Sequence, residues 1–284
     1  MYAKFGPAGN ADAFPYKSSV DAPRWIASLG LDCYEYQCGK GVNVGEETAR
    51  KIGAAAREAG IGLTLHAPYF INLANPDPES LVKTTGYILE GCKAADWMGA
   101  TRVVVHTGAL MKRSRREAME IAKASMRHVL EAWEAAGYGH IALCPETMGK
   151  INQLGDLDEV LELCQLDDRL LPTIDFGHLY ARTLGELTGR DAVEIMLDKV
   201  EKALGEDRAS RFHSHFSKIQ FTPNGGEKMH LTFDQDDFGP DPDPLMDAVA
   251  HRGWSPTFIC ESAGTQERDA LAMKKRYFEA LRGG

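Results

Sequence analysis

The sequence predicts a closed (β/α)8 barrel of the TIM type, with its active site at the C-terminal rim of the strands. Three observations carry this prediction. Short apolar runs alternate with helical patterns, the runs suit buried parallel strands, and 284 residues fit one barrel. No linker or low-complexity tract interrupts the chain, so residues 1–284 are expected to form a single domain. An open, doubly wound sheet is the alternative, because alternation by itself does not separate the two folds.

The expected strands are short segments rich in β-branched, aromatic or other apolar residues. They are residues 2–7, 33–38, 62–67, 102–106, 141–146, 171–175, 212–218 and 257–261. The helices expected between them are residues 46–59, 78–98, 114–136, 156–164, 186–204, 244–251 and 266–281. The segment 114–136 opens with Ser114 and Glu117 at the spacing of a capping box, which favours a helix that begins there.

The composition, 44% hydrophobic and 26% charged, is that of an ordinary globular protein. No apolar run approaches the roughly 18 residues of a membrane span, and the first residues do not resemble a signal peptide. A cytoplasmic protein without membrane contact is therefore expected. Six scattered cysteines without a CxxC pair indicate buried thiols in a reducing compartment. The chain has no phosphate-loop motif, so we expect no organic cofactor, and a monomer is the default state.

The formal net charge of −9 argues against a nucleic-acid partner at first sight. Positive charge is nevertheless concentrated in one loop, at Lys112, Arg113, Arg115 and Arg116. This loop follows an expected strand end, where its side chains could bind phosphates. A solvated start of a helix explains the same cluster equally well.

Histidines and carboxylates gather at or just after the ends of six successive expected strands. They are His66, His106, Glu146, Asp175, His178, His213, Glu227, His230 and Glu261. In a barrel nearly all of these positions meet at the C-terminal mouth. Any one histidine at a strand end is more often a hydrogen-bonded structural residue than a metal ligand. Together, however, four converging carboxylates would repel one another unless cations lay between them.

This set of nitrogen and oxygen donors suits zinc, with manganese or iron as alternatives. The donors are too many for one tetrahedral ion but fit three if one carboxylate bridges two of them. Three divalent ions would leave the four carboxylates with an excess of positive charge, which suits a phosphodiester substrate.

Five motifs resemble those of endonuclease IV, a family of the xylose-isomerase-like barrel superfamily. The first is His66-Ala-Pro-Tyr-Phe-Ile-Asn-Leu73. The others are Val-Val-Val-His106, Pro-Glu146-Thr, Ile-Asp175-Phe-Gly-His178 and Ile-Cys-Glu261-Ser. They keep the family's order at comparable intervals over residues 60–263. The combination is specific, whereas the wider superfamily shares several of the single motifs.

The resemblance implies up to three zinc ions and a DNA substrate. The first ion would be held by His66, His106 and Glu146, the second by Glu146 with Asp175, His213 and Glu261, and the third by His178, Glu227 and His230. It also implies hydrolysis of the phosphodiester 5′ to abasic sites, as in base excision repair, with Glu146 and Glu261 as catalytic residues. Glu261 would orient or deprotonate the attacking water, and Tyr69 would contact the distorted DNA.

Two positions depart from the family pattern. The third ion is commonly held by Asp-x-His, whereas this chain has Glu227-Lys-Met-His230. The seventh strand offers two histidines, and we choose His213 as the ligand from its spacing to Lys218, which leaves His215 as a substrate contact.

A sugar isomerase or epimerase of the same superfamily is the alternative function. Glu146, Asp175, His213 and Glu261 would suffice for its single ion. The endonuclease is favoured by four further candidate ligands that have no role in a one-ion isomerase, namely His106, His178, Glu227 and His230.

Overall fold

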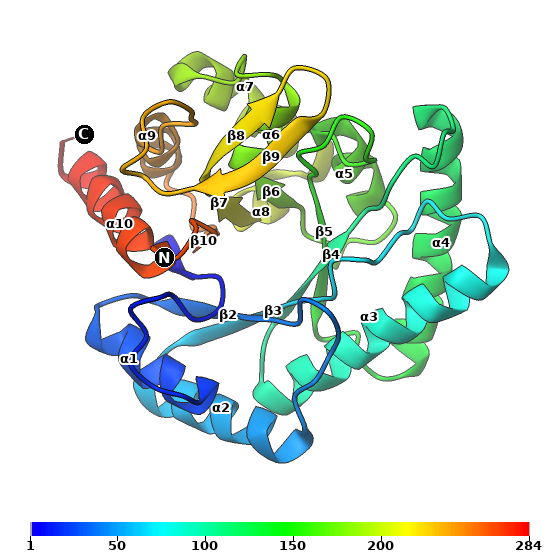
Figure 1. The fold of residues 1–284 in the computed structure, drawn as a ribbon, viewed down its shortest axis with the longest axis horizontal. Helices are drawn as coiled ribbons and strands as arrows, with labels where there is room; N and C mark the ends of the chain where they lie inside the picture. The colour runs from blue at the N-terminus through cyan, green and yellow to red at the C-terminus, as the bar shows by residue number, and fades with distance from the viewer. Residues whose placement is uncertain (1, 284) are drawn as a thin grey trace.

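A ring of parallel strands forms the centre of the protein, as the computed structural model of residues 2–283 shows (Figure 1). The strands follow one another in the order β1-β10-β7-β6-β5-β4-β3-β2. They are β1 (Lys4–Pro7), β2 (Cys33–Gln37), β3 (Gly62–His66), β4 (Arg102–His106), β5 (Ala142–Glu146), β6 (Thr173–Asp175), β7 (His213–Phe216) and β10 (Thr257–Cys260). A parallel bridge between Ala8 and Glu35 joins the two ends of this order. The nearly closed ring confirms the predicted (β/α)8 barrel and excludes the open sheet.

Helices surround the ring on the outside (Figure 1). They are the 3-10 helix η1 (Ser19–Asp21), α1 (Ala22–Ser28), α2 (Glu46–Ala59), α3 (Pro78–Met98), α4 (Arg115–Ala135), α5 (Leu157–Cys164), α6 (Phe176–Arg182), α7 (Gly189–Leu204), α8 (Glu206–Ala209), α9 (Asp243–Arg252) and α10 (Gln266–Gly283). The expected capping box is present, since Ser114 and Glu117 each bond the other's backbone N–H. The seven predicted helices are confirmed, with small shifts at their ends, and η1, α1, α6 and α8 were not predicted.

Alternate residues of each strand face the inside of the barrel. The main apolar core lies between the strands and the helices, where Leu65, Val103 and Leu143 are buried. Polar side chains occupy several inward positions, and Glu35 in the middle of β2 and Glu146 at the end of β5 are both buried. This arrangement places ionisable groups in the interior, so each needs a partner.

A hairpin follows the seventh barrel strand, where the sequence indicated only a loop. Its strands β8 (Lys218–Thr222) and β9 (Gly226–Leu231) pair antiparallel and form a separate sheet. In Figure 1 this hairpin lies beside α6, over the part of the ring that contains β6 and β7. Two candidate ligands, Glu227 and His230, are therefore on a strand outside the barrel wall.

The prediction of buried thiols is confirmed, since all six cysteines are buried and free. Within residues 2–283, none of the helices combines the length and apolar character that crossing a membrane would require.

Candidate metal centre

Glu146, at the end of β5, lies at the centre of the candidate site. Its side chain is 1% exposed. One oxygen, Oε2, is 3.3 Å from His66 Nε2 and 3.2 Å from His106 Nε2. The other, Oε1, is 2.7 Å from His215 Nδ1. Glu146 thus has an imidazole nitrogen beside each of its oxygens, and it would be able to hold a cation together with these histidines.

Asp175 and Glu261 are the two other carboxylates that lie close to Glu146. Asp175 Oδ1 accepts the backbone N–H of His178 at 2.7 Å, and its Oδ2 is buried without a hydrogen-bond partner. Burial and the charges of Glu261 and Glu146 raise the pKa of Asp175. Asp175, Glu146, Glu261 and His215 each bring a donor atom within 4.8 Å of the others. We call these four residues, with His66 and His106, the barrel group. An orphaned buried oxygen among converging carboxylates fits a cation.

Three histidines of the site have their Nδ1 atoms next to backbone carbonyls. His66 Nδ1 lies 2.6 Å from the carbonyl of Ala67, His106 Nδ1 lies 2.8 Å from that of Tyr69, and His178 Nδ1 lies 2.8 Å from that of Thr147. Since a carbonyl only accepts, each Nδ1 carries the proton, and the lone pair of each neutral ring is on Nε2. These Nε2 atoms face Glu146 or Glu227. Metal-ligating histidines are commonly oriented in this way.

The hairpin supplies a second group of donors, Glu227 and His230, which lie beside His178 of α6. We call these three residues the hairpin group, and their donor atoms also lie within 4.8 Å of one another. Glu227 Oε2 is 3.6 Å from His178 Nε2, and Oε1 is 3.9 Å from His230 Nε2. His230 Nδ1 is 2.8 Å from the hydroxyl of Ser217. The group can accept an ion separate from those of the barrel group.

A β-bulge explains how Glu227 and His230 face the same side although they are three positions apart in the sequence. In regular β structure residues i and i+3 face opposite sides. Here Gln220 pairs with Met229 and Phe221 pairs with Glu227, so Lys228 is an extra residue in β9. A bulge shifts the alternation by one position. The extra residue relative to Asp-x-His is thereby absorbed, and both donors face His178.

The loop from β5 to α5 is held against this hairpin. Glu227 donates its backbone N–H to the carbonyl of Gly149 at 3.0 Å, and Ile151 donates to the carbonyl of Gly225 at 3.2 Å. Arg182 bonds the carbonyls of Met148, Lys150 and Gln153 at 2.9 to 3.0 Å. These carbonyls fix the loop, and the loop in turn fixes the backbone at Glu227.

The predicted ligand His213 lies away from Glu146, Asp175 and Glu261, whereas His215 lies beside them. The two residues face the same side of β7, but His213 lies one inward layer deeper, away from the mouth. Its Nε2 is 2.9 Å from Glu35 Oε2, and its Nδ1 is 3.5 Å from Arg102. Both nitrogens thus have protein partners. Among the described residues, it is His215 that stands with Glu146, Asp175 and Glu261.

The charged groups of the site shift one another's pKa values. Burial opposes the ionisation of Glu146, but the charge of His215 and hydrogen bonds from His106, His215 and His66 lower its pKa well below the usual value. Burial also opposes protonation of His178, yet Asp175, Glu227 and Glu146 raise its pKa to about 9. Protons on imidazoles therefore balance the carboxylates when no ion does.

A cavity of about 330 Å³ opens over both groups. It is lined by His66, His106, Glu146, His178, Glu227, His230 and Glu261, and also by Tyr69 and Lys150. Tyr69 is 54% exposed, so its ring is free to contact a substrate. Lys150 was not singled out from the sequence, because a lone lysine in a loop has no distinguishing pattern.

The residues of the basic cluster after β4 lie in different surroundings in the structure. Arg115 does not project freely, because its guanidinium bonds Glu159 and the carbonyls of Ile151 and Gln153. Arg113 and Arg116 line an open hollow at the start of α4, apart from the cavity over the two groups of candidate ligands. Lys112 is exposed.

Residues 23–280 match the model of the xylose isomerase-like TIM barrel family. The chain belongs to this family. An uncharacterized protein of Methanocaldococcus jannaschii is 33% identical over 254 residues, which cover 89% of this chain and 90% of that protein. A probable endonuclease 4 of Thermoplasma acidophilum is 28% identical over 177 residues, or 61% of this chain and 59% of that relative. The resemblance to endonuclease IV is thus confirmed as a family relationship.

Solved structures share the fold over nearly the whole chain. A D-tagatose 3-epimerase-like protein has a TM-score of 0.73 at 19% identity and covers 99% of this chain and 98% of its own. Endonuclease IV from Thermus thermophilus has a TM-score of 0.68 at 18% identity, with 99% and 100% covered. Because these likenesses concern the fold alone, the activity has to be argued from the site.

Proposed function

We propose that this protein is a zinc-dependent endonuclease that hydrolyses the phosphodiester 5′ to abasic sites in DNA. The observation that carries the proposal is the hairpin group. His178, Glu227 and His230 form a separate cluster of donors beside a four-ligand set that would be sufficient for one ion. A site that stabilises a phosphodiester gains from several cations, whereas an isomerase that uses one ion has no role for this cluster.

The ligand assignment in this proposal differs from the sequence-based one only on β7. His66, His106 and Glu146 would hold the first ion, and Glu146, Asp175, His215 and Glu261 the second. The hairpin group would hold the third. Zinc held by these residues would supply Lewis-acid stabilisation of the negative charge that develops on the phosphoryl oxygens.

The side chains divide the remaining work. Glu261 is 16% exposed and lines the cavity, so it can orient a water molecule and accept its proton. Glu146 holds His66, His106 and His215 in place from the centre. Tyr69 and Lys150 stand at the cavity, where an aromatic face can contact the DNA and an ammonium group can bind a phosphate.

The proposal includes a monomeric enzyme of one domain that acts in the cytoplasm. Six free, buried cysteines agree with a reducing compartment. Lys112, Arg113 and Arg116 are proposed to bind phosphates outside the cavity, and Arg115 is proposed to support the loop instead.

A single-ion sugar epimerase is the second candidate, and one observation favours it. Glu146, Asp175, His215 and Glu261 alone form a complete ligand set for one ion at the end of the barrel. The D-tagatose 3-epimerase-like structure has this fold over nearly its entire length. In this case the hairpin group would be a hydrogen-bonded wall of the cavity.

A metal count together with two activity assays tests the proposal. Protein purified without chelator is expected to carry about two to three zinc ions per chain, following the ligand count, and to cut a duplex that contains one abasic-site analogue. An undamaged duplex of the same sequence is the control. One tightly bound ion, an intact abasic duplex and turnover of a ketose would replace the endonuclease with the epimerase.

A further inference from the structure

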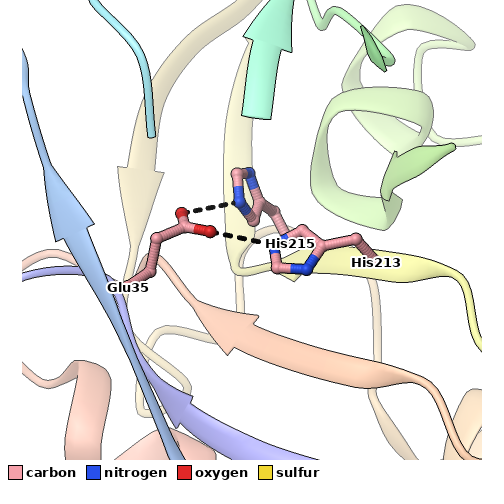
Figure 2. Close-up of side chains that lie close together, drawn as sticks. All are labelled: Glu35, His213 and His215. Carbon is pink, nitrogen blue, oxygen red and sulfur yellow. Dashed lines mark hydrogen bonds and ion pairs between the residues drawn. The ribbon is translucent and has the colours of Figure 1, made fainter. Parts of the chain in front are cut away.

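Glu35 joins the two histidines of β7 from the opposite side of the barrel interior (Figure 2). It lies in the middle of β2, and its side chain is fully buried. Its Oε1 is 2.9 Å from His215 Nε2, and its Oε2 is 2.9 Å from His213 Nε2. A buried carboxylate that is not among the proposed ligands needs an explanation, because its desolvation is costly.

The acceptor positions of Glu35 are already filled by hydrogens. Besides the two histidines, Gln37 Nε2 donates to Oε1 at 3.0 Å and Thr64 Oγ1 donates to Oε2 at 2.9 Å. A carboxylate offers about four lone-pair positions. Glu35, His213 and His215 have the spacing of a metal site, but these four bonds leave Glu35 no lone pair for an ion. Its role must therefore concern the histidines.

The direction of these hydrogen bonds can be deduced from their two fixed ends. Arg102 can only donate, so His213 Nδ1 accepts from it at 3.5 Å and His213 Nε2 carries the proton that it donates to Glu35. The guanidinium of Arg102 is itself held by the carbonyls of Phe212 and Arg211. At the other end the Glu35 carboxylate only accepts, so His215 Nε2 must carry a proton.

This assignment makes His215 the reverse of the other candidate ligands. His66, His106 and His178 give their Nδ1–H to backbone carbonyls and present Nε2 to the site. His215 gives its Nε2–H to Glu35 and presents Nδ1, which is 2.7 Å from Glu146 Oε1 and 3.6 Å from Glu261 Oε1. On the side away from the site, His215 is held by a carboxylate instead of a backbone carbonyl, so its orientation depends on Glu35.

We propose that Glu35 is a positioning residue for the metal centre, which holds His215 in the tautomer that coordinates through Nδ1. His213, steadied by Arg102, keeps the Glu35 carboxylate in place and is not a ligand. The inference rests on the metal centre of the proposed function. Loss of such a partner behind a ligating histidine typically weakens metal binding about 10-fold to 100-fold.

The unmodified protein gives the first test. In zinc-loaded protein with 15N-labelled histidines, long-range ¹H–15N NMR spectra distinguish which ring nitrogen carries the proton and which binds the ion. We expect one imidazole bound through Nδ1 with a protonated Nε2, and the other ligating rings bound through Nε2. His215→Gln should remove the signal of the reversed ring, and His213→Gln should leave it. If every ligating ring is bound through Nε2, the proposal is wrong.

A pair of variants gives the second test. Glu35→Gln keeps the size of the side chain but places an amide that can donate against one of the histidines. Its affinity for one zinc ion per chain should fall about 10-fold to 100-fold in competition with a chromophoric chelator. Thr64→Val is the matched control, because it removes a donor to the same carboxylate without touching His215. Equal losses in both variants, or none in Glu35→Gln, would overturn the proposal.

These tests separate the inference from the function. Neither depends on cleavage, so a protein that binds zinc through His215 Nδ1 but leaves abasic DNA intact would refute the endonuclease and support the role of Glu35. A wild-type protein that binds no divalent ion would refute both. If Glu35→Gln does not fold, the spectrum of the wild-type protein decides.

Discussion

The barrel group and the hairpin group are built in different ways. Glu146, Asp175 and His215 stand at the ends of adjacent barrel strands, and the register of the ring fixes their spacing. Glu227 and His230 stand on β9, outside the ring, and depend on a bulge and on contacts to the loop after β5. The first group is therefore as rigid as the fold, whereas the second can be altered without changing the register of any barrel strand.

The largest expected effect comes from Glu261, the proposed catalytic side chain of the barrel group. Glu261→Gln should lower the rate of cleavage about 10²-fold to 10⁴-fold, because it removes the proposed acceptor of the water proton. Single-turnover cleavage of a duplex with an abasic analogue measures the rate, and circular dichroism checks that the fold is intact. Undiminished cleavage would exclude Glu261 from the proton transfer.

Variants of the two histidines of β7 test which of them is a metal ligand. Removing the partner behind a ligating histidine weakens metal binding about 10-fold to 100-fold. His215→Gln removes the ligand itself, so the affinity for metal should fall by at least as much. His213→Gln should retain the wild-type metal content, since the amide can still donate to Glu35. Zinc content after dialysis against graded chelator distinguishes them. A His213→Gln protein that loses an ion would restore the assignment made from spacing.

A glycine tests whether the hairpin group can be lost independently. A Cβ at Gly149 would lie 2.7 Å from the Cβ of Glu227 and 2.9 Å from His178 Cδ2, so Gly149→Ala should displace Glu227. We expect the most weakly bound ion to dissociate at an about tenfold lower concentration of free chelator, while the other ions stay bound. This corresponds to a loss of about 1.4 kcal/mol in the binding free energy of that ion. Gly86→Ala is the control, because a Cβ there meets nothing within 4 Å. Loss of all ions together would show that the two groups are one unit.

The smallest effect is expected from the basic residues beyond both groups. Replacing Lys112, Arg113 and Arg116 by alanine should flatten the salt dependence of DNA binding by about 0.9 in logarithmic slope for each phosphate that the variant no longer binds. Replacing Arg50, Lys51 and Arg57 by alanine is the matched control, because it removes three exposed positive charges from α2. Fluorescence anisotropy at several salt concentrations gives the slopes. Equal slopes would assign the cluster to the solvated start of α4.

The fold was predictable because its signals are local. Short apolar runs and capping residues identify the alternating strands and helices from the sequence, and the capping box of Ser114 and Glu117 forms as expected. The strand-end donors were also visible, since each follows a run of apolar residues. These features need no knowledge of which strands lie opposite one another.

The rest of the site depends on distances across the barrel, and the sequence does not contain them. Glu35 is in mid-strand, and its partners are 178 and 180 residues away. His213 and His215 face the same side, so alternation cannot say which one reaches the mouth. The bulge at Lys228 has no local signature, yet it decides the position of His230.

The bonds between the loop after β5 and β9 also have a dynamic consequence. The amides of Ile151 and Glu227 donate to carbonyls on each other's segment, so neither can exchange its hydrogen with solvent until the two segments part. Arg182 ties the same loop to α6 through three carbonyls. Loop and hairpin therefore open as one cooperative unit, and the two amides should share a single opening free energy below that of global unfolding.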